Sequence, residues 1–230
     1  MAEFLQLSGL IVSCQALPGS PLKGPQFMAA MAEAAVLGGC SAVRVNGPAD
    51  IRAVREKVEV PVLGINKSAD RGADSVYITP TFESAREVAE AGADIIGLDA
   101  TGRPRPGDEK LGELIRRVHE ELGLGVVADV DTVASGLAAV EAGADYVATT
   151  LSGSTAETAC DRTAQPDLRL VGRLVREANV PVIAEGRLHT PEAAAGAFAL
   201  GAVAVVVGTA ITNPTAITTA FVTMCAPYCV

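Results

Sequence analysis

The chain has 230 residues, of which 49% are hydrophobic and 3% aromatic, and its formal net charge is −9. That charge argues against a nucleic-acid-binding surface, so any anion site must be built from local groups. No apolar run reaches the roughly 18 to 20 residues that cross a bilayer, and the start of the chain lacks the basic and long apolar parts of a signal peptide. We therefore expect a soluble cytoplasmic protein with neither a nucleic-acid nor a membrane partner.

Apolar runs rich in β-branched residues alternate with alanine-rich amphipathic stretches along the whole chain. Glycines close these stretches at intervals of about 50 residues, as expected where a left-handed conformation ends a helix; they are Gly39, Gly92, Gly143 and Gly201. In chain order, the runs expected to form strands are 10–14, 42–45, 61–66, the run ending at 99, 125–130, the run ending at 149–150, 181–186 and 202–207. The repeat therefore predicts eight parallel strands with intervening helices, in four quarters.

Eight such strands in a chain of this length predict an α/β fold, a (β/α)8 TIM barrel that forms a single domain over residues 1–230. An open doubly wound sheet is the alternative. Four evenly spaced quarters favour closure, because an open sheet more naturally shows two halves about a switch point.

Two predicted strands are near copies of each other, residues 60–67 (VPVLGINK) and 180–187 (VPVIAEGR). Side chains alternate along a strand, so Glu185 and Arg187 are expected on one face, and Lys67 on the corresponding face of its own strand. The carboxyl ends of barrel strands meet at one mouth. The sequence therefore predicts that a lysine and a glutamate converge there.

Polar residues also end the other strands; they are Gln15, Asn46, Asp99, Asp129, Asp131, Thr149, Thr150 and Thr209. Asp129 and Asp131 could each pair with a nearby cation. Glu185 could equally form a structural pair with Arg187. Burying several charges without a function is costly, and this favours a site at the mouth.

Arg44 lies inside an apolar run, where it must either face the barrel lumen or interrupt the helix layer. A structural ion pair is one interpretation. Next to Lys67, however, a guanidinium disfavours the charged form of the amine and suits the lysine to accept a proton. Considered without its neighbours, Lys67 could instead be a solvated residue at the end of a strand or a residue that binds phosphate.

Glycines follow the last two predicted strands, Gly186 and the pair Gly208–Thr209. Loops at these positions habitually bind phosphate in such barrels, although glycine at a strand end is also ordinary turn chemistry. Thr190 and the proline after it begin a helix, so we expect His189 to be structural. The long connection 152–165 is expected to be either a lid over the mouth or a surface loop.

The chain has five cysteines, an odd number, and we expect them to be cytosolic thiols. Those near the C-terminus have no His or Asp beside them that would suggest a metal site. They are Cys14, Cys40, Cys160, Cys225 and Cys229.

Several segments, in order, resemble the bacterial N-acetylmannosamine-6-phosphate 2-epimerase family. They are 9–18 (GLIVSCQALP), 78–80 (ITP), 98–101 (LDAT), 149–153 (TTLSG), 183–187 (IAEGR), 189–191 (HTP) and 205–208 (VVVG). The resemblance covers nearly the whole chain. It implies a (β/α)8 barrel that needs no cofactor and interconverts N-acetylmannosamine 6-phosphate and N-acetylglucosamine 6-phosphate in sialic acid catabolism.

The resemblance also implies roles for individual residues. Lys67 corresponds to the proton-transferring lysine and Glu185 to its acidic partner, with Arg44 and Asp129 in support. The residues expected to contact the substrate are Gln15, Gly186, Arg187, Gly208 and Thr209. The chain departs from the family at Asn213, where an arginine is usual, and at Asp131, where a serine is usual.

The chemistry of the residues agrees with this resemblance. Inverting a carbon next to a carbonyl requires one proton to leave and return through an enolate, with a base, oxyanion donors and a phosphate anchor. Lys67, Arg44 and the loop after the eighth strand supply a base, a donor and a phosphate anchor, and we expect no metal to be needed. A Schiff-base lysine aldolase or lyase and a non-catalytic phosphosugar-binding barrel are the alternatives, and a homodimer is possible.

Overall fold

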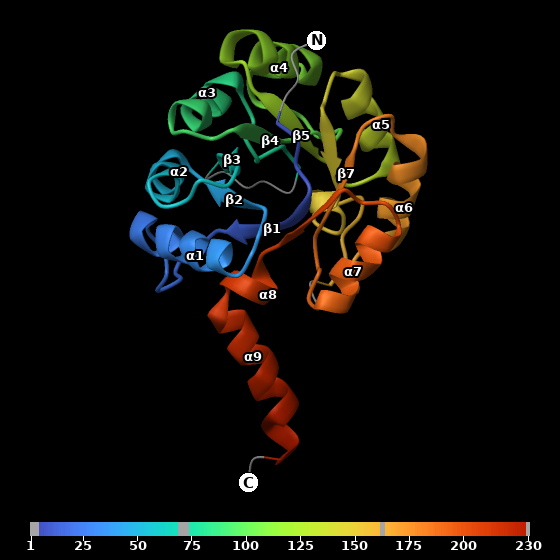
Figure 1. Cartoon of the computed structure of the whole chain (residues 1–230). Helices are drawn as coiled ribbons and strands as arrows, with labels where there is room; N and C mark the ends of the chain where they lie inside the picture. The colour runs from blue at the N-terminus through green and yellow to red at the C-terminus, as the bar shows by residue number, and fades with distance from the viewer. Residues whose placement is uncertain (1–4, 69–73, 162–163, 229–230) are drawn as a thin grey trace.

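The computed structural model describes residues 5–68, 74–161 and 164–228. Eight parallel strands close into a barrel in sequence order (Figure 1). The strands are β1 (Gly9–Cys14), β2 (Ala42–Asn46), β3 (Val62–Ile65), β4 (Ile95–Asp99), β5 (Gly125–Asp129), β6 (Tyr146–Ala148), β7 (Val182–Glu185) and β8 (Ala204–Val207). Because β8 pairs with β1, the expected (β/α)8 barrel is confirmed and the open sheet is excluded.

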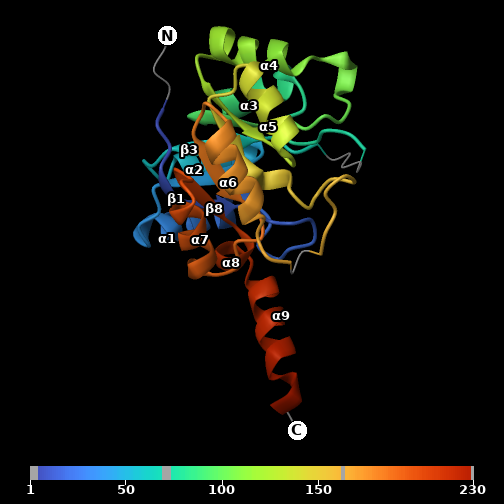
Figure 2. The same cartoon turned by 90° about the vertical axis from the view of Figure 1, so that its right-hand side faces the viewer.

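Helices surround this sheet, except α9, which projects away from the barrel (Figures 1 and 2). They are α1 (Pro25–Leu37), α2 (Pro48–Arg55), α3 (Phe82–Glu90), α4 (Leu111–Arg117), α5 (Val133–Glu141), α6 (Leu168–Glu177), α7 (Pro191–Ala199), α8 (Thr209–Thr212) and α9 (Pro214–Cys225). Shorter turns are η1 (Pro106–Asp108), the π-helical η2 (Val118–Leu122), η3 (Thr149–Leu151) and η4 (Ala226–Tyr228). In the described part of the chain, every helix is too short or too polar to span a membrane.

The predicted helix ends and starts have the expected local geometry. The four repeat glycines follow α1, α3, α5 and α7 with φ between 90° and 102°, a conformation that glycine adopts without strain. Thr190 caps α7, since its side chain accepts a hydrogen bond from the Ala193 N–H at 3.2 Å, and Pro191 follows at the first turn.

The core has two layers that follow from strand alternation. Side chains that point into the lumen include Ile11, Leu63, Val127 and Ile183. Those that point outward pack against the helices, as Val43 and Val45 do. Apolar side chains thus fill the lower lumen, and the polar groups at the carboxyl ends of the strands lie above them.

Candidate active site

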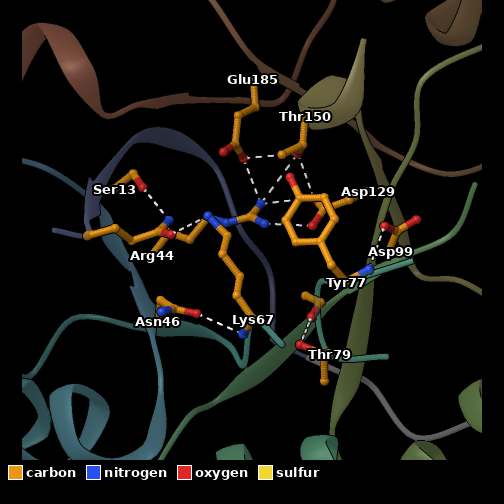
Figure 3. Close-up of polar contacts among 12 residues, drawn as sticks. Ser13, Arg44, Asn46, Lys67, Tyr77, Thr79, Asp99, Asp129, Thr150 and Glu185 are labelled. Atoms are coloured by element: carbon orange, nitrogen blue, oxygen red, sulfur yellow. Dashed lines mark hydrogen bonds and ion pairs between the residues drawn. The ribbon is translucent and has the colours of Figure 1, made fainter. Parts of the chain in front are cut away.

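Arg44 points into the lumen, because it lies between the outward-facing Val43 and Val45 on β2. Its side chain is only 1% exposed. Nη1 and Nη2 donate to the two carboxylate oxygens of Asp129 at 2.9 and 2.6 Å, and Nη1 also donates to Glu185 at 2.6 Å (Figure 3). The structure therefore joins three of the expected residues, from β2, β5 and β7, in one buried network.

The charge of Arg44 is balanced within this network. Burial by itself would lower the arginine pKa, but the carboxylates of Asp129 and Glu185 outweigh it and raise that pKa above its usual range. Arg44 therefore presents no unbalanced charge to Lys67, in contrast to the expectation from the sequence. Arg44 Nε is buried and has no hydrogen-bond partner among the described residues. An unsatisfied buried donor costs free energy, so stability alone does not explain this arginine.

Glu185 is the last residue of β7, and two neighbouring side chains, Arg44 and Thr150, hydrogen-bond its carboxylate. Its Oε2 accepts from Arg44 and lies 3.1 Å from Thr150 Oγ1, which also donates to Asp129 at 2.5 Å. Burial raises the pKa of Glu185, and the charge of Asp129 adds to this, against the opposing effects of Arg44 and Lys67. A carboxyl group with a raised pKa holds a proton at higher pH than usual, which suits proton transfer.

Lys67 reaches the mouth just after β3. Its backbone N–H donates to Asn46 Oδ1 at 2.9 Å, and its backbone pairs with Ile78 in an antiparallel bridge. Its Nζ donates to Gln15 Oε1 at 2.6 Å, and the Gln15 amide in turn donates to Ser13 Oγ at 2.7 Å. The amide of Gln15 therefore orients the Lys67 side chain. From the sequence we expected Gln15 only to contact the substrate.

A pocket opens at this mouth. It is lined by Ser13, Gln15, Leu17, Lys67, Thr150, Glu185, Gly186, Arg187, Leu188, His189, Val206, Gly208, Thr209, Thr212 and Asn213. Lys67 and Glu185 thus share a pocket with every expected substrate-contacting residue. Arg44 and Asp129 lie fully buried below it.

Sequence reasoning left several lining residues without a role. Thr150 was recognised only as a strand end, and Ser13, the second-last residue of β1, has the same signal of a polar residue at a strand end. Thr212 and Leu188 carry no sequence signal of their own. His189, expected to be structural, is exposed and lies in the pocket wall.

Glu185 and Arg187 do not lie on one face, contrary to the strand-based expectation. β7 ends at Glu185, and the backbone then turns through Gly186 (φ 108°) and Arg187 (φ 56°). Arg187 Nε donates to the Gln165 carbonyl at 3.1 Å, and its Nη1 donates to the Ser152 carbonyl. Side chains alternate between two faces only while the backbone is extended. Here the extended conformation ends at Glu185, so Arg187 does not share its face.

The two candidate aspartates have separate roles. Asp129 pairs with Arg44, whereas Asp131 accepts from Ser135 Oγ at 2.9 Å and Thr155 Oγ1 at 2.8 Å. Asp131 thus fastens the connection after β6 instead of pairing with a cation. Arg187 holds both ends of this connection. Whether residues 152–165 act as a lid stays a prediction, and residues 162–163 lie outside the described part.

Asp99, another predicted strand end, is buried and supports the loop after β4. It accepts from Thr101 Oγ1 at 2.7 Å and forms an ion pair with Arg103 at 2.6 Å. Its Oδ2 also accepts from the backbone N–H of Tyr77 at 3.2 Å. Tyr77, which the sequence did not single out, is thereby placed beside the Arg44 network (Figure 3).

Cys14, Cys40 and Cys160 are free thiols. Cys14 and Cys40 are buried, Cys160 and Cys225 are exposed, and Cys229 lies outside the described residues. Within the described ranges, no group of three or more His, Cys, Asp or Glu side chains is placed to hold a metal ion.

Comparison with known proteins gives concordant matches over nearly the whole chain. Residues 28–226 match the family model described as "Putative N-acetylmannosamine-6-phosphate epimerase". A Thermosynechococcus vestitus protein described as a 2-epimerase for the same substrate is 54% identical over 89% of this chain and 88% of its own length. A Cutibacterium acnes protein with that description is 51% identical over 91% and 90%. The solved structure of the N-acetylmannosamine-6-phosphate 2-epimerase from Clostridium perfringens superposes with a TM-score of 0.89 at 39% identity, covering 94% of this chain and 93% of that one.

Proposed function

This chain belongs to the N-acetylmannosamine-6-phosphate epimerase family, and from that membership we propose that it interconverts N-acetylmannosamine 6-phosphate and N-acetylglucosamine 6-phosphate. The two sugars differ in configuration at C2, next to the C1 aldehyde of the open chain. Removing the C2 proton gives an enolate, and returning a proton to the other face gives the epimer. This places the protein in amino-sugar metabolism, in the breakdown of sialic acid.

The observation that carries the proposal is the placement of Lys67 and Glu185 in one pocket. They follow β3 and β7, which are four strands apart in the closed ring of eight and so lie on opposite walls of the mouth. A planar enolate between them presents one face to each side chain. Lys67, as the neutral amine, takes the proton from one face and becomes the ammonium, and Glu185, whose pKa is raised, delivers its proton to the other face.

The remaining residues hold this pair in place. The terminal nitrogens of Arg44 already donate to Asp129 and Glu185, so its role is to fix the Glu185 carboxyl group. Gln15 fixes the Lys67 ammonium, which stabilises the enolate oxygen once it has gained the proton. Fixed donors of this kind need no reorganisation during the reaction.

The phosphate end of the pocket lies on the strand-eight side. Gly186, Gly208 and Thr209 line it, and they offer backbone N–H groups to an anion. A side chain on Gly208 would place its Cβ 3.2 Å from Ser13 Cβ, so glycine keeps this wall close to β1. Binding energy from the phosphate then holds the sugar at the two proton-transfer groups.

Incubation of either sugar phosphate with the protein in D₂O tests the proposal. We expect the epimer to form and to carry deuterium at C2 from the first turnovers, while early unreacted substrate keeps its hydrogen, as transfer between two groups requires. Product that retains the original C2 hydrogen would contradict proton exchange. Covalent trapping of Lys67 by substrate and borohydride would instead support the Schiff-base alternative.

We further propose that the reaction needs no metal or organic cofactor, that it takes place in the cytoplasm, and that the working form is a homodimer. The first part follows from the proton-transfer groups that the pocket itself supplies. The last part follows from the exposed apolar side chains of α9, among them Phe221, Val222 and Met224.

A further inference from the structure

Thr79 has an unusual backbone conformation for a buried residue. Its φ is 44°, and the residue is fully buried. A β-branched residue is rarely found at positive φ, because its side chain then crowds the backbone. Strain of this kind persists only where the surrounding contacts enforce it, and it is concentrated at functional sites. The contacts of Thr79 therefore indicate what the strain serves.

Thr79 belongs to a short segment that separates the carboxyl ends of β3 and β4. These strands pair directly at only two positions. Beyond them, residues 77–79, which we call the wedge, lie between the two strands. Ile78 pairs with Lys67 in an antiparallel bridge on the β3 side, and its carbonyl accepts from the Asp99 N–H at 2.8 Å on the β4 side. The wedge is thus a short extra strand at the mouth of the barrel, next to Lys67.

The side chain of Thr79 joins β3 and β4 across the wedge. Its hydroxyl accepts a hydrogen bond from the Asn66 N–H at 3.0 Å and donates one to the Gly97 carbonyl at 2.6 Å. Its own N–H donates to the Asn66 carbonyl at 2.8 Å. Buried backbone groups need such partners, and a hydroxyl can accept and donate at once. Thr79 therefore holds both backbone polar groups of Asn66, and these contacts keep it in its strained conformation.

Asn66 directly precedes Lys67, the residue proposed to take the C2 proton. The wedge holds the Lys67 backbone on one side, through Asn66 and Ile78. On the other side, Asn46 of β2 accepts from the Lys67 N–H at 2.9 Å (Figure 3). A lysine side chain is a flexible four-carbon stem, so its ammonium group occupies a defined place only if the backbone at its base is fixed. Gln15 then holds the other end of the side chain at 2.6 Å.

We propose that the wedge is a positioning element for Lys67 and that the buried hydroxyl of Thr79 locks it in place. The strained conformation lets the N–H and the hydroxyl of one residue bind the same neighbour, so a single residue fixes the peptide groups next to the lysine. Misplacing a reacting group by about 1 Å can lower a rate by ~10²-fold. The catalytic part of this inference rests on the proposed function, whereas the effect on the Lys67 backbone does not.

Thr81, two residues further along, offers a matched control in the same segment. Its side chain caps α3 by accepting from the Ser84 N–H at 3.2 Å. Loss of such a cap lowers the stability of a protein. Thr81→Ala therefore removes a threonine hydroxyl close to the wedge and destabilises the fold, but leaves the contacts of Thr79 with Asn66 in place.

Amide hydrogen exchange, followed by NMR, tests the wedge without reference to catalysis. The N–H of Lys67 donates to Asn46 and not to Thr79, so its exchange reports on the lysine backbone. Relative to the amides of β5, we expect this N–H to exchange at least ~10-fold faster in Thr79→Val, which lacks the hydroxyl. It should exchange at the wild-type rate in Thr79→Ser and in Thr81→Ala. The same relative rate in Thr79→Val and the wild type would overturn the proposal.

Thr79→Gly keeps the test decisive if the valine variant does not fold. Glycine adopts a φ of 44° without strain, so this variant lacks the hydroxyl but also loses the strain, and it should be more stable than Thr79→Val. Circular dichroism and thermal melting measure both. The Lys67 N–H should nevertheless exchange faster in Thr79→Gly, and wild-type exchange there would equally overturn the proposal.

Steady-state kinetics test the catalytic part. Thr79→Val and Thr79→Gly should each lower kcat for the sugar phosphate by at least ~10-fold, with KM changed by less than ~3-fold, because the phosphate end of the pocket is untouched. Equal kcat losses at different stabilities separate positioning from a structural role, and Thr79→Ser should restore kcat. A wild-type kcat in Thr79→Gly, or an equal loss in Thr81→Ala, would overturn positioning. A wild-type protein that does not epimerise would refute the proposed function alone, and hydrogen exchange would still decide the role of the wedge.

Discussion

Arg44 and Asp129 face each other across the barrel lumen as a bidentate pair, with Nη1–Oδ1 at 2.9 Å and Nη2–Oδ2 at 2.6 Å. They belong to β2 and β5, which are not neighbours in the sheet, so the pair spans the lumen. Two parallel hydrogen bonds fix the plane of the guanidinium. That plane directs Nη1 at Glu185, and the position of the proposed proton donor therefore depends on a residue that does not line the pocket.

Replacing Arg44 by methionine should leave two buried carboxyl groups beside each other without their cation. We expect the free energy of unfolding to fall by about 3–5 kcal/mol, the range for breaking a buried pair. The matched control is Arg173→Met, which breaks an exposed pair with Glu177 and should cost no more than about 1 kcal/mol. Denaturant titration measures both. Equal losses in the two variants would show that the lumen network has no special weight.

Lys67→Ala should abolish epimerisation while the phosphosugar still binds. Loss of a positioned proton-transfer group typically costs about 10²–10⁴-fold in rate, whereas the proposed phosphate anchor lies on the strand-eight side. Lys57→Ala, at an exposed lysine two residues after the end of α2, is the control. Turnover rates and calorimetric affinities decide the matter. A Lys67→Ala rate within ten-fold of wild type would remove Lys67 from the mechanism.

Glu185→Gln should keep the fold at neutral pH and lose most of the activity, because the amide keeps the hydrogen-bond geometry but cannot transfer a proton. Melting temperature and specific activity are measured on one sample. A large fall in melting temperature with full activity per folded molecule would assign Glu185 a structural role and leave Lys67 to work with Asp129.

The pH dependence of stability gives an independent test of the Glu185 environment. Its folded-state pKa is raised by burial above the unfolded value, so its contribution to stability is complete below the unfolded pKa and is lost as the pH rises through the folded one. Glu185→Gln lacks this loss. The difference in unfolding free energy, variant minus wild type, should therefore grow in favour of the variant with rising pH. A difference that shrinks would mean that the pKa is lowered instead.

Activity should be unchanged after incubation with EDTA and dialysis, because the proposed steps use only side chains of the pocket. Initial rates before and after treatment, with and without added Mg²⁺ or Zn²⁺, provide the measurement. Activity that disappears with the chelator and returns with a metal would contradict a cofactor-independent reaction.

Most of the architecture was determined by the sequence. The recurring glycines and the alternation of apolar runs with alanine-rich stretches predicted eight strands and a closed barrel, because helix ends and buried strands impose strong local requirements. The same patterns identified the strand ends that carry Lys67 and Glu185. Parallel strands of a barrel have all their carboxyl ends on one side, so the convergence of these residues followed from the fold class.

Only the tertiary structure decided which charged groups meet. Glu185 contacts Arg44 and not Arg187, because the chain leaves the extended conformation at Gly186. Gln15 binds Lys67 across the mouth, and Asp131 fastens a loop. The sequence could not show that α9, apolar enough for a core, remains outside its own barrel. The hydrophobic pattern indicates that a surface is buried, but not which surface covers it. That depends on where the chain can reach, and the one-residue link at Asn213 limits how α9 can be placed.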